Sequence, residues 1–208
     1  MKHPTKVFDE WAICGKDKGM ETSHSDSVSE ILDYALAKLD TKDMPFSFLD
    51  IGCGNGWVVR KMKEHPLCEK AIGVDGALDM IRKANTIDQG GTYFCSDLLK
   101  WFPKEKVDFI HSMEVMYYFK NPGELINHMK LNWLKPGGKM IMGVDFYQEH
   151  ERSHTWPTDL GTHMTLLSEK NWISLFNDHG FSHIENFRAN VHDNFPGTLV
   201  ISGVLDSI

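Results

Sequence analysis

Short apolar runs alternate with segments of helical spacing along most of the chain. The apolar runs predict buried strands at 46–52, 70–75, 92–95, 107–112, 139–146, 184–191 and 198–205. Segments with apolar residues at helical spacing lie at 57–64, 77–84, 121–134 and 168–179. Because strands and helices alternate at this spacing, we expect an open, mostly parallel α/β sheet with helices on both faces.

Two segments depart from this alternation. Residues 1–26 are polar, with few large apolar side chains, and the capping box Ser27–Glu30 predicts a helix from there to about Asp40. The connection 147–168 is long, and connections of this length are usually functional or disordered. Since it is rich in aromatic and imidazole side chains, we interpret it, together with the N-terminal segment, as a lid over a pocket.

The charge balance bears on the class of partner. The chain has 29 acidic and 22 basic residues, which gives a formal net charge of −7, and its basic residues form no dense run. A nucleic-acid partner would require a basic face, so we expect none. The four cysteines have neither disulfide nor metal spacing, and we expect neither a signal peptide nor a membrane span. These features predict a cytoplasmic protein.

A glycine-rich turn follows the first predicted strand, in Asp50–Gly56. Its glycines occupy alternate positions, and a residue without a Cβ lets the backbone turn tightly and approach a ligand closely. A dinucleotide site of the G-x-G-x-x-G form would need glycine at Trp57, and a phosphate loop would need a following Gly-Lys-Ser or Gly-Lys-Thr. The turn therefore predicts a ligand site of another kind at the carboxyl edge of the sheet.

Carboxylates lie at the ends of the next two predicted strands. Asp75 ends the second strand, where a carboxylate can accept hydrogen bonds from both hydroxyls of a ribose. Asp97 follows the third strand, where it can accept a hydrogen bond from an adenine amino group while the Leu98 amide faces a ring nitrogen. A helix N-cap is the alternative interpretation of Asp75. Together these positions predict a nucleoside ligand.

At this point the chain resembles the class I S-adenosylmethionine-dependent methyltransferases. Asp50–Gly56, Gly73–Asp75, Ser96–Asp97 and Leu134–Gly138 stand in the order and spacing of that family, and the resemblance covers about 46–145. It implies S-adenosylmethionine as the cofactor and a seven-stranded Rossmann-like sheet whose last strand is antiparallel. It also implies that Gly52 and Gly54 lie near the methionine moiety of the cofactor and that Asp75 binds the ribose. Met80 would cover the adenine, although a position in the hydrophobic core is the alternative interpretation of this side chain. The cofactor-binding residues implied by the resemblance are Asp50, Gly52, Gly54, Asp75, Gly76, Met80, Ser96, Asp97, Leu98, Ser112 and Met113.

The acceptor of the methyl group is less well indicated. A sulfonium is already an activated methyl donor, so the protein mainly aligns the reactants. Without a large inserted domain, we expect a small-molecule acceptor; an RNA or protein substrate and a non-catalytic binding module are the alternatives. The residues expected to bind the acceptor are Trp11, Tyr117, Tyr147, His150, His154 and His163, with Tyr117 and His154 as catalytic residues.

The sequence His150–His154 has the H-E-x-x-H form of a zinc site. It lies just past a predicted strand and is followed at once by Thr155-Trp156-Pro157, which leaves too little room for a stable helix. We therefore expect no bound metal, and a looser metal or acceptor role for these histidines and His163 stays open.

These expectations divide the chain into one methyltransferase domain, 1–208. Its parts are an N-terminal lid segment and helix (1–45), a cofactor-binding core (46–146), a lid insertion (147–168) and a C-terminal helix with a strand hairpin (169–208). The sequence leaves the oligomeric state open.

Overall fold

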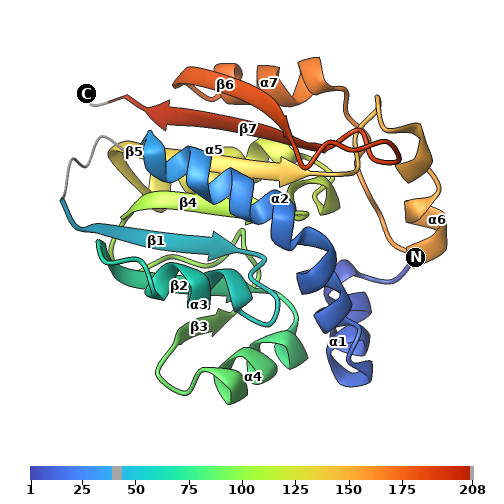
Figure 1. Ribbon diagram of the computed structural model, residues 1–208, viewed down its shortest axis with the longest axis horizontal. Helices are drawn as coiled ribbons and strands as arrows, with labels where there is room; N and C mark the ends of the chain where they lie inside the picture. The colour runs from blue at the N-terminus through green and yellow to red at the C-terminus, as the bar shows by residue number, and fades with distance from the viewer. Residues whose placement is uncertain (39–43, 207–208) are drawn as a thin grey trace.

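The computed structural model describes residues 1–38 and 44–206, and its centre is a seven-stranded sheet of order β3-β2-β1-β4-β5-β7-β6 (Figure 1). The strands are β1 (Phe46–Ile51), β2 (Cys68–Asp75), β3 (Thr92–Cys95), β4 (Val107–Met113), β5 (Leu134–Val144), β6 (Phe181–Ala189) and β7 (Thr198–Leu205). Neighbours from β3 to β5 are parallel, and β7 is antiparallel to both β5 and β6. The predicted open, mostly parallel Rossmann-like sheet with an antiparallel last strand is confirmed.

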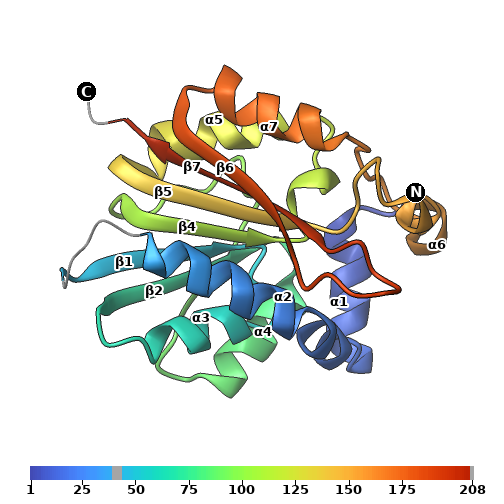
Figure 2. The same cartoon turned by 45° about the horizontal axis from the view of Figure 1, so that its top comes forward.

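Helices cover both faces of this sheet (Figure 2). They are α1 (Pro4–Cys14), α2 (Asp17–Ala37), α3 (Trp57–Lys63), α4 (Leu78–Ile87), α5 (Pro122–Asn132), α6 (Trp156–Leu160) and α7 (Glu169–Asp178), with 3-10 turns η1 (Met116–Tyr118) and η2 (Glu151–Ser153). Side chains alternate between the faces of a strand, so Phe48 packs in the core with α2 and α3 while Leu49 packs in the core with α5 and α7.

The N-terminal prediction was wrong in one respect. Residues 1–26 form two helices rather than an irregular segment, and Ser27 lies inside α2 rather than at its start. The Ser27 hydroxyl is buried and accepts a hydrogen bond from Thr198 Oγ1 at 2.9 Å. The first turns of α2 are polar because they face a cavity and solvent, which hides them from a search for apolar periodicity. Asp40, the expected end of this helix, lies outside the described residues.

The other observed helix and strand boundaries differ less from the predicted ones. β5 begins at Leu134, so it includes Lys135–Gly138, which lie before the strand predicted at 139–146. The connection 147–168 contains the short elements α6 and η2. The helix predicted at 168–179 is α7, and its N-cap is Ser168, whose Oγ accepts from the Asn171 N–H at 3.2 Å. None of the helices in the described ranges is long and apolar enough to span a membrane.

The direction of the strands positions the site. The arrowheads of β1 and β5 point toward the side of the molecule where α1 and α6 lie (Figure 1). The carboxyl ends of the parallel strands therefore meet beneath these two helices, and in open α/β sheets ligands bind at this edge.

Candidate functional site

A cavity of about 1350 Å³ lies at the carboxyl ends of the parallel strands, beneath α1. All but one of the predicted cofactor residues line it, namely Asp50, Gly52, Gly54, Asp75, Gly76, Met80, Ser96, Asp97, Leu98 and Met113. The exception, Ser112, is fully buried in β4, and its hydroxyl has no hydrogen-bond partner within the described chain. The structure thus brings the predicted cofactor residues together, and their individual roles stay predictions.

The glycines of the turn after β1 serve different purposes. A Cβ on Gly52 would lie 2.2 Å from Val115 Cγ2, and one on Gly56 would lie 2.4 Å from the Tyr93 ring. At Gly54 the nearest neighbour of such a Cβ would be Met80 Sδ at 4.0 Å, in the wall of the cavity. Gly52 and Gly56 therefore allow close packing of the protein itself, whereas Gly54 leaves space on the cavity side.

Asp75 holds the glycine-rich turn against the end of β2. Its Oδ2 accepts the Gly54 N–H at 2.9 Å, and its Oδ1 accepts the Ala77 N–H at 2.7 Å. Burial raises the pKa of Asp75 from 3.8 to about 6. The N-cap position of α4 belongs to Ala77, so the alternative interpretation of Asp75 as the N-cap was wrong. An Asp75 carboxylate at the cavity wall fits the hydroxyls of a ribose.

The N-terminal helix closes the cavity from above. The Lys2 N–H donates to the Gly161 carbonyl at 2.8 Å, and Thr162 Oγ1 donates to the Lys2 carbonyl at 3.0 Å, which joins the N-terminus to the end of α6. On the other side, Asp9 Oδ1 accepts the Asp79 N–H of α4 at 2.9 Å. These contacts support the predicted lid made from the N-terminal segment and the 147–168 connection.

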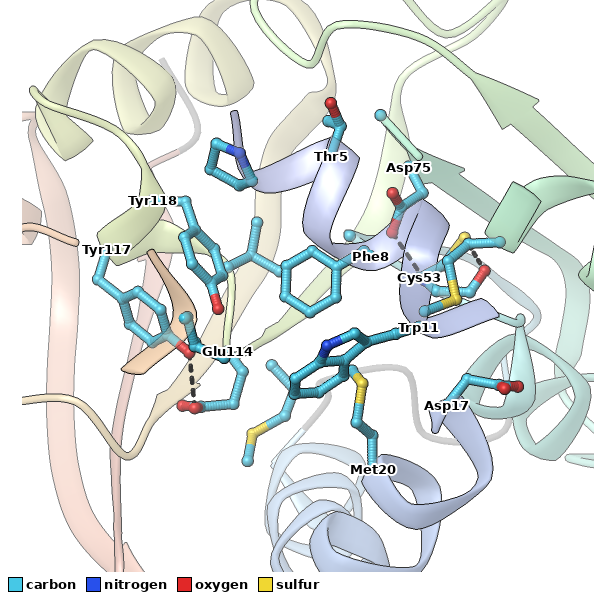
Figure 3. A pocket seen from close by; sticks show the side chains of 18 of the residues that line it. Thr5, Phe8, Trp11, Asp17, Met20, Cys53, Asp75, Glu114, Tyr117 and Tyr118 are labelled. Carbon is cyan, nitrogen blue, oxygen red and sulfur yellow. Dashed lines mark hydrogen bonds between the residues drawn. The ribbon is translucent and has the colours of Figure 1, made fainter. Parts of the chain in front are cut away.

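An acidic group and aromatic rings form the other half of the cavity. The Tyr117 hydroxyl donates to Glu114 Oε2 at 2.7 Å, and burial, reinforced by the charge of Asp145, raises the pKa of Glu114 well above its ordinary value. The Phe8 ring packs edge-on against Trp11 at 5.6 Å and Tyr118 at 5.4 Å between centroids. Figure 3 shows Phe8 and Trp11 between the Tyr117–Glu114 pair and Asp75.

Three of the predicted acceptor residues are placed elsewhere. Tyr147 is fully buried and donates to the Gly197 carbonyl at 2.9 Å. His150 is buried and donates from Nδ1 to the Asp145 carbonyl at 2.7 Å, while the exposed His154 donates from Nε2 to the Gln148 carbonyl at 3.1 Å. Tyr147, His150 and His154 do not line the cavity formed by the described residues, so the structure does not bring these predicted acceptor and catalytic residues together with Trp11, Tyr117 and His163.

The reason lies in the path of the chain after β5. None of the described residues 145–150 lines the cavity, and η2, which starts at Glu151, is a single 3-10 turn. The two histidines of the H-E-x-x-H match therefore bind separate backbone carbonyls rather than sharing one helix face.

Trp11, Tyr117 and His163 do line the cavity, as expected. Sequence reasoning assigned no catalytic role to Glu114 and expected His24 only as part of the N-terminal lid segment; both line the cavity. Glu114 could have been found because it directly follows β4, beside Met113. For His24 the sequence carries no signal of a chemical role beyond the lid, because it lies in a polar stretch of α2.

Comparison with known proteins places this geometry in a family. A profile described as a methyltransferase domain matches residues 20–186. Malonyl-(acyl-carrier protein) O-methyltransferase of Halalkalibacterium halodurans is 28% identical over 133 residues, 59% of this chain and 49% of that protein. The tRNA U34 carboxymethyltransferase of Hydrogenovibrio crunogenus is 33% identical over 103 residues, 45% of this chain and 30% of that protein. The chain thus spans about half or less of the length of these curated relatives.

A solved structure covers the whole chain. It is a methyltransferase in complex with the Haloferax volcanii Trm112 methyltransferase activator, with a TM-score of 0.82, 25% identity and 100% of both chains covered. The family profile spans most of the sequence, the strand order agrees with the resemblance, and the predicted cofactor residues line one cavity. The chain therefore belongs to the class I S-adenosylmethionine-dependent methyltransferases.

Proposed function

We propose that this chain transfers the methyl group of S-adenosylmethionine to a small organic acceptor with an apolar, aromatic body. The observation that carries the proposal is the size of the cavity, about 1350 Å³. A pocket for one ligand usually has roughly 300–1000 Å³. The cavity therefore has room for an acceptor beside the cofactor, and the lid residues Phe8 and Trp11 together with Tyr118 of η1 supply its aromatic walls.

Methyl transfer from S-adenosylmethionine requires correctly aligned reactants more than it requires reactive side chains. A nucleophilic atom of the acceptor forms a bond to the methyl carbon while the sulfur–methyl bond breaks, and S-adenosylhomocysteine leaves with the electron pair. Holding the reactants in line can contribute about 7–11 kcal/mol. The residues that would hold the cofactor are those at the ends of β1, β2 and β3, and the lid would exclude water from the methyl group.

Glu114 is the polar group best placed to face the acceptor. It lies at the end of β4 in the cavity wall, and the Tyr117 hydroxyl fixes its Oε2. A carboxyl whose pKa is raised by burial can accept a proton from an acceptor that loses one on methylation. Tyr117 in this arrangement is a positioning residue, because its hydroxyl is bonded to the carboxylate rather than free.

The variant Tyr117→Phe tests this arrangement. Removing the hydroxyl frees Glu114 Oε2, so we expect methyl transfer to slow at least tenfold while the Kd for S-adenosylhomocysteine changes less than twofold. The matched control is His154→Ala, which changes an exposed side chain outside the cavity and is expected to turn over at the wild-type rate. The measurement is single-turnover transfer from labelled S-adenosylmethionine, on an acceptor found by a metabolite screen for gain of the label.

Two results would contradict the proposal. A protein that binds the cofactor but forms no S-adenosylhomocysteine with any metabolite fraction would be a binding module. Labelling confined to RNA or protein fractions would instead assign it a macromolecular substrate, which the formal charge of −7 disfavours.

A second proposal concerns an activating subunit similar to Trm112, which accompanies the similar solved methyltransferase. β3 is an edge strand, and its outer side has no partner strand among the described residues. Phe94 on this strand is 42% exposed and its ring packs against Trp101, and Phe102 is 61% exposed. The other edge, β6, carries ion pairs such as Arg188–Glu169 instead. An unpaired edge with exposed aromatic rings suits a partner that adds a strand.

Co-expression with a Trm112-type protein, followed by size-exclusion chromatography, checks this second proposal. We expect a one-to-one complex that Phe94→Lys abolishes, because a lysine on an edge strand opposes strand addition. Val191→Lys, at a residue that is 62% exposed in the β6–β7 turn, should leave the complex intact. Co-elution that survives Phe94→Lys would move the partner away from β3.

A further inference from the structure

Three metal-ligating side chains converge beside the acceptor half of the cavity, which two of them, His24 and Glu114, line. His24 comes from α2, Glu114 directly follows β4, and Asp145 directly follows β5. One ligand atom from each lies within 4.8 Å of the others. The sheet places the two carboxylates side by side, because β4 and β5 are parallel neighbours and the Glu114 N–H donates to the Gly143 carbonyl at 2.9 Å.

The carboxylate oxygens of this cluster can accept more hydrogen bonds than the described residues donate to them. Asp145 is 6% exposed, and its Oδ1 has no hydrogen-bond partner in the described part of the chain. Its Oδ2 lies 3.6 Å from His24 Nε2, the sole ion pair that either carboxylate makes with a described residue. Glu114 accepts one hydrogen bond on each oxygen, from the Asp145 N–H and from the Tyr117 hydroxyl. A carboxylate oxygen can accept two such bonds, so each keeps a free lone pair.

The negative charges of the two carboxylates also favour a bound cation. Two adjacent buried carboxylates repel each other and lose hydration, and a cation between them would relieve both effects. A mixed set of one imidazole and two carboxylates suits a divalent first-row ion, since imidazole favours zinc and iron whereas carboxylates also accept manganese. Three protein ligands with an open position are the arrangement of a catalytic rather than a structural metal site.

The geometry points to a divalent metal site formed by His24, Glu114 and Asp145, which takes an ion such as Mn²⁺ or Zn²⁺. This site is separate from the His150/His154 pair, whose rings bind backbone carbonyls. The proposal departs from the expectation of no bound metal, because the three ligands are separated by 90 and 31 positions along the chain and only the fold brings them together.

The open side of this site faces the acceptor. His24 and Glu114 line the cavity, so an ion held there could also bind an oxygen of the acceptor. A bound cation lowers the pKa of a coordinated hydroxyl. A role of the ion in catalysis rests on the proposed function. In that step the acceptor hydroxyl loses its proton to water, its oxygen forms a bond to the methyl carbon, and the sulfur–methyl bond breaks. This role assigns the acceptor to molecules with a hydroxyl or carboxylate oxygen, and Glu114 becomes a ligand rather than a base.

Metal binding is measured without turnover, so its result is independent of the proposed function. The chelator-treated full chain is titrated calorimetrically with Mn²⁺ and with Zn²⁺, and its metal content after dialysis is measured by elemental analysis. We expect one ion per chain with a Kd below 100 μM, and His24→Ala and Asp145→Asn are each expected to weaken binding at least tenfold, since even loss of an outer-shell partner costs about 10–100-fold. His154→Ala, the control histidine, should bind as the wild type does.

Thermal unfolding and circular dichroism establish that each variant is folded; should Asp145→Asn fail to fold, His24→Ala decides. A wild-type Kd above 1 mM for both ions, or equal affinities in wild type and His24→Ala, would overturn the proposal. Binding of a primary amine at this cluster without binding of either ion would also overturn it and assign the carboxylates to a cationic acceptor. Ion binding with no methyl transfer to any oxygen acceptor would keep the metal site and remove the proposed function.

Discussion

Asp75→Ala is expected to lower the affinity for S-adenosylhomocysteine at least a hundredfold. The carboxylate lies in the cavity wall, held by the Gly54 and Ala77 N–H groups, where it can accept both ribose hydroxyls. A hydrogen bond to a charged group contributes about 1.5–3 kcal/mol, and two such bonds correspond to at least a hundredfold in Kd. Isothermal titration calorimetry with S-adenosylhomocysteine measures the change directly.

Two companion variants make this result interpretable. Asp79→Ala removes a carboxylate from the neighbouring helix α4, where it pairs with Arg82 at 2.9 Å outside the cavity, and should bind normally. Asp75→Asn keeps one acceptor oxygen for the turn and should bind more tightly than Asp75→Ala. Undiminished affinity in Asp75→Ala, with a folded protein by circular dichroism, would remove Asp75 from the ribose role.

The pH dependence of the same titration follows from the pKa of Asp75, which burial raises from 3.8 to about 6. Ribose hydroxyls favour the ionised carboxylate, so we expect affinity to fall as pH drops from 7.5 to 5. The contribution of Asp75 to folding stability has the opposite sign: it is fully present below pH 3.8 and is lost as pH rises through about 6, because the folded protein holds this proton more tightly. In Asp75→Asn the pH dependence of affinity should be much weaker, whereas an unchanged pH profile would assign it to another group.

The cofactor half of the cavity could be predicted from the sequence because its residues lie at strand ends. Asp50, Asp75 and Asp97 each lie at or just after the end of an apolar run, and parallel strands bring their carboxyl ends to one edge. Local order along the chain therefore implies closeness in space. The same reasoning correctly placed Tyr117 near the cavity, since η1 follows β4 after a short turn.

The acceptor half could not be predicted in the same way. Its walls come from α1 and the start of α2, whose polar sequence shows little periodicity because one side of these helices faces a cavity. Tyr147 follows its strand just as Tyr117 does, but it packs inward and binds the Gly197 carbonyl, a contact 50 residues away. The direction of a side chain in an irregular connection depends on such tertiary contacts, which the sequence pattern does not contain.

Gly54→Ala should weaken cofactor binding at least a hundredfold while leaving the protein folded. Gly54 has φ +52°, and a Cβ built there would meet only Met80 Sδ, at 4.0 Å. The folding cost is therefore that of a left-handed alanine, about 1–2 kcal/mol. The added methyl enters the side of the cavity lined by the cofactor residues, so we expect at least a hundredfold weaker binding of S-adenosylhomocysteine, or about 2.7 kcal/mol.

The matched control for this prediction is Gly161→Ala. Gly161 has φ +63°, and an added Cβ there has no heavy atom within 4 Å among those described, so its alanine carries a similar left-handed backbone strain. It lies at the end of α6 rather than in the cavity lining. Both variants should lose similar melting temperature without ligand, and only Gly54→Ala should lose the rise in melting temperature that bound S-adenosylhomocysteine produces. An equal ligand-induced rise in both would show that the cofactor does not approach Gly54, because strain alone is common to the pair.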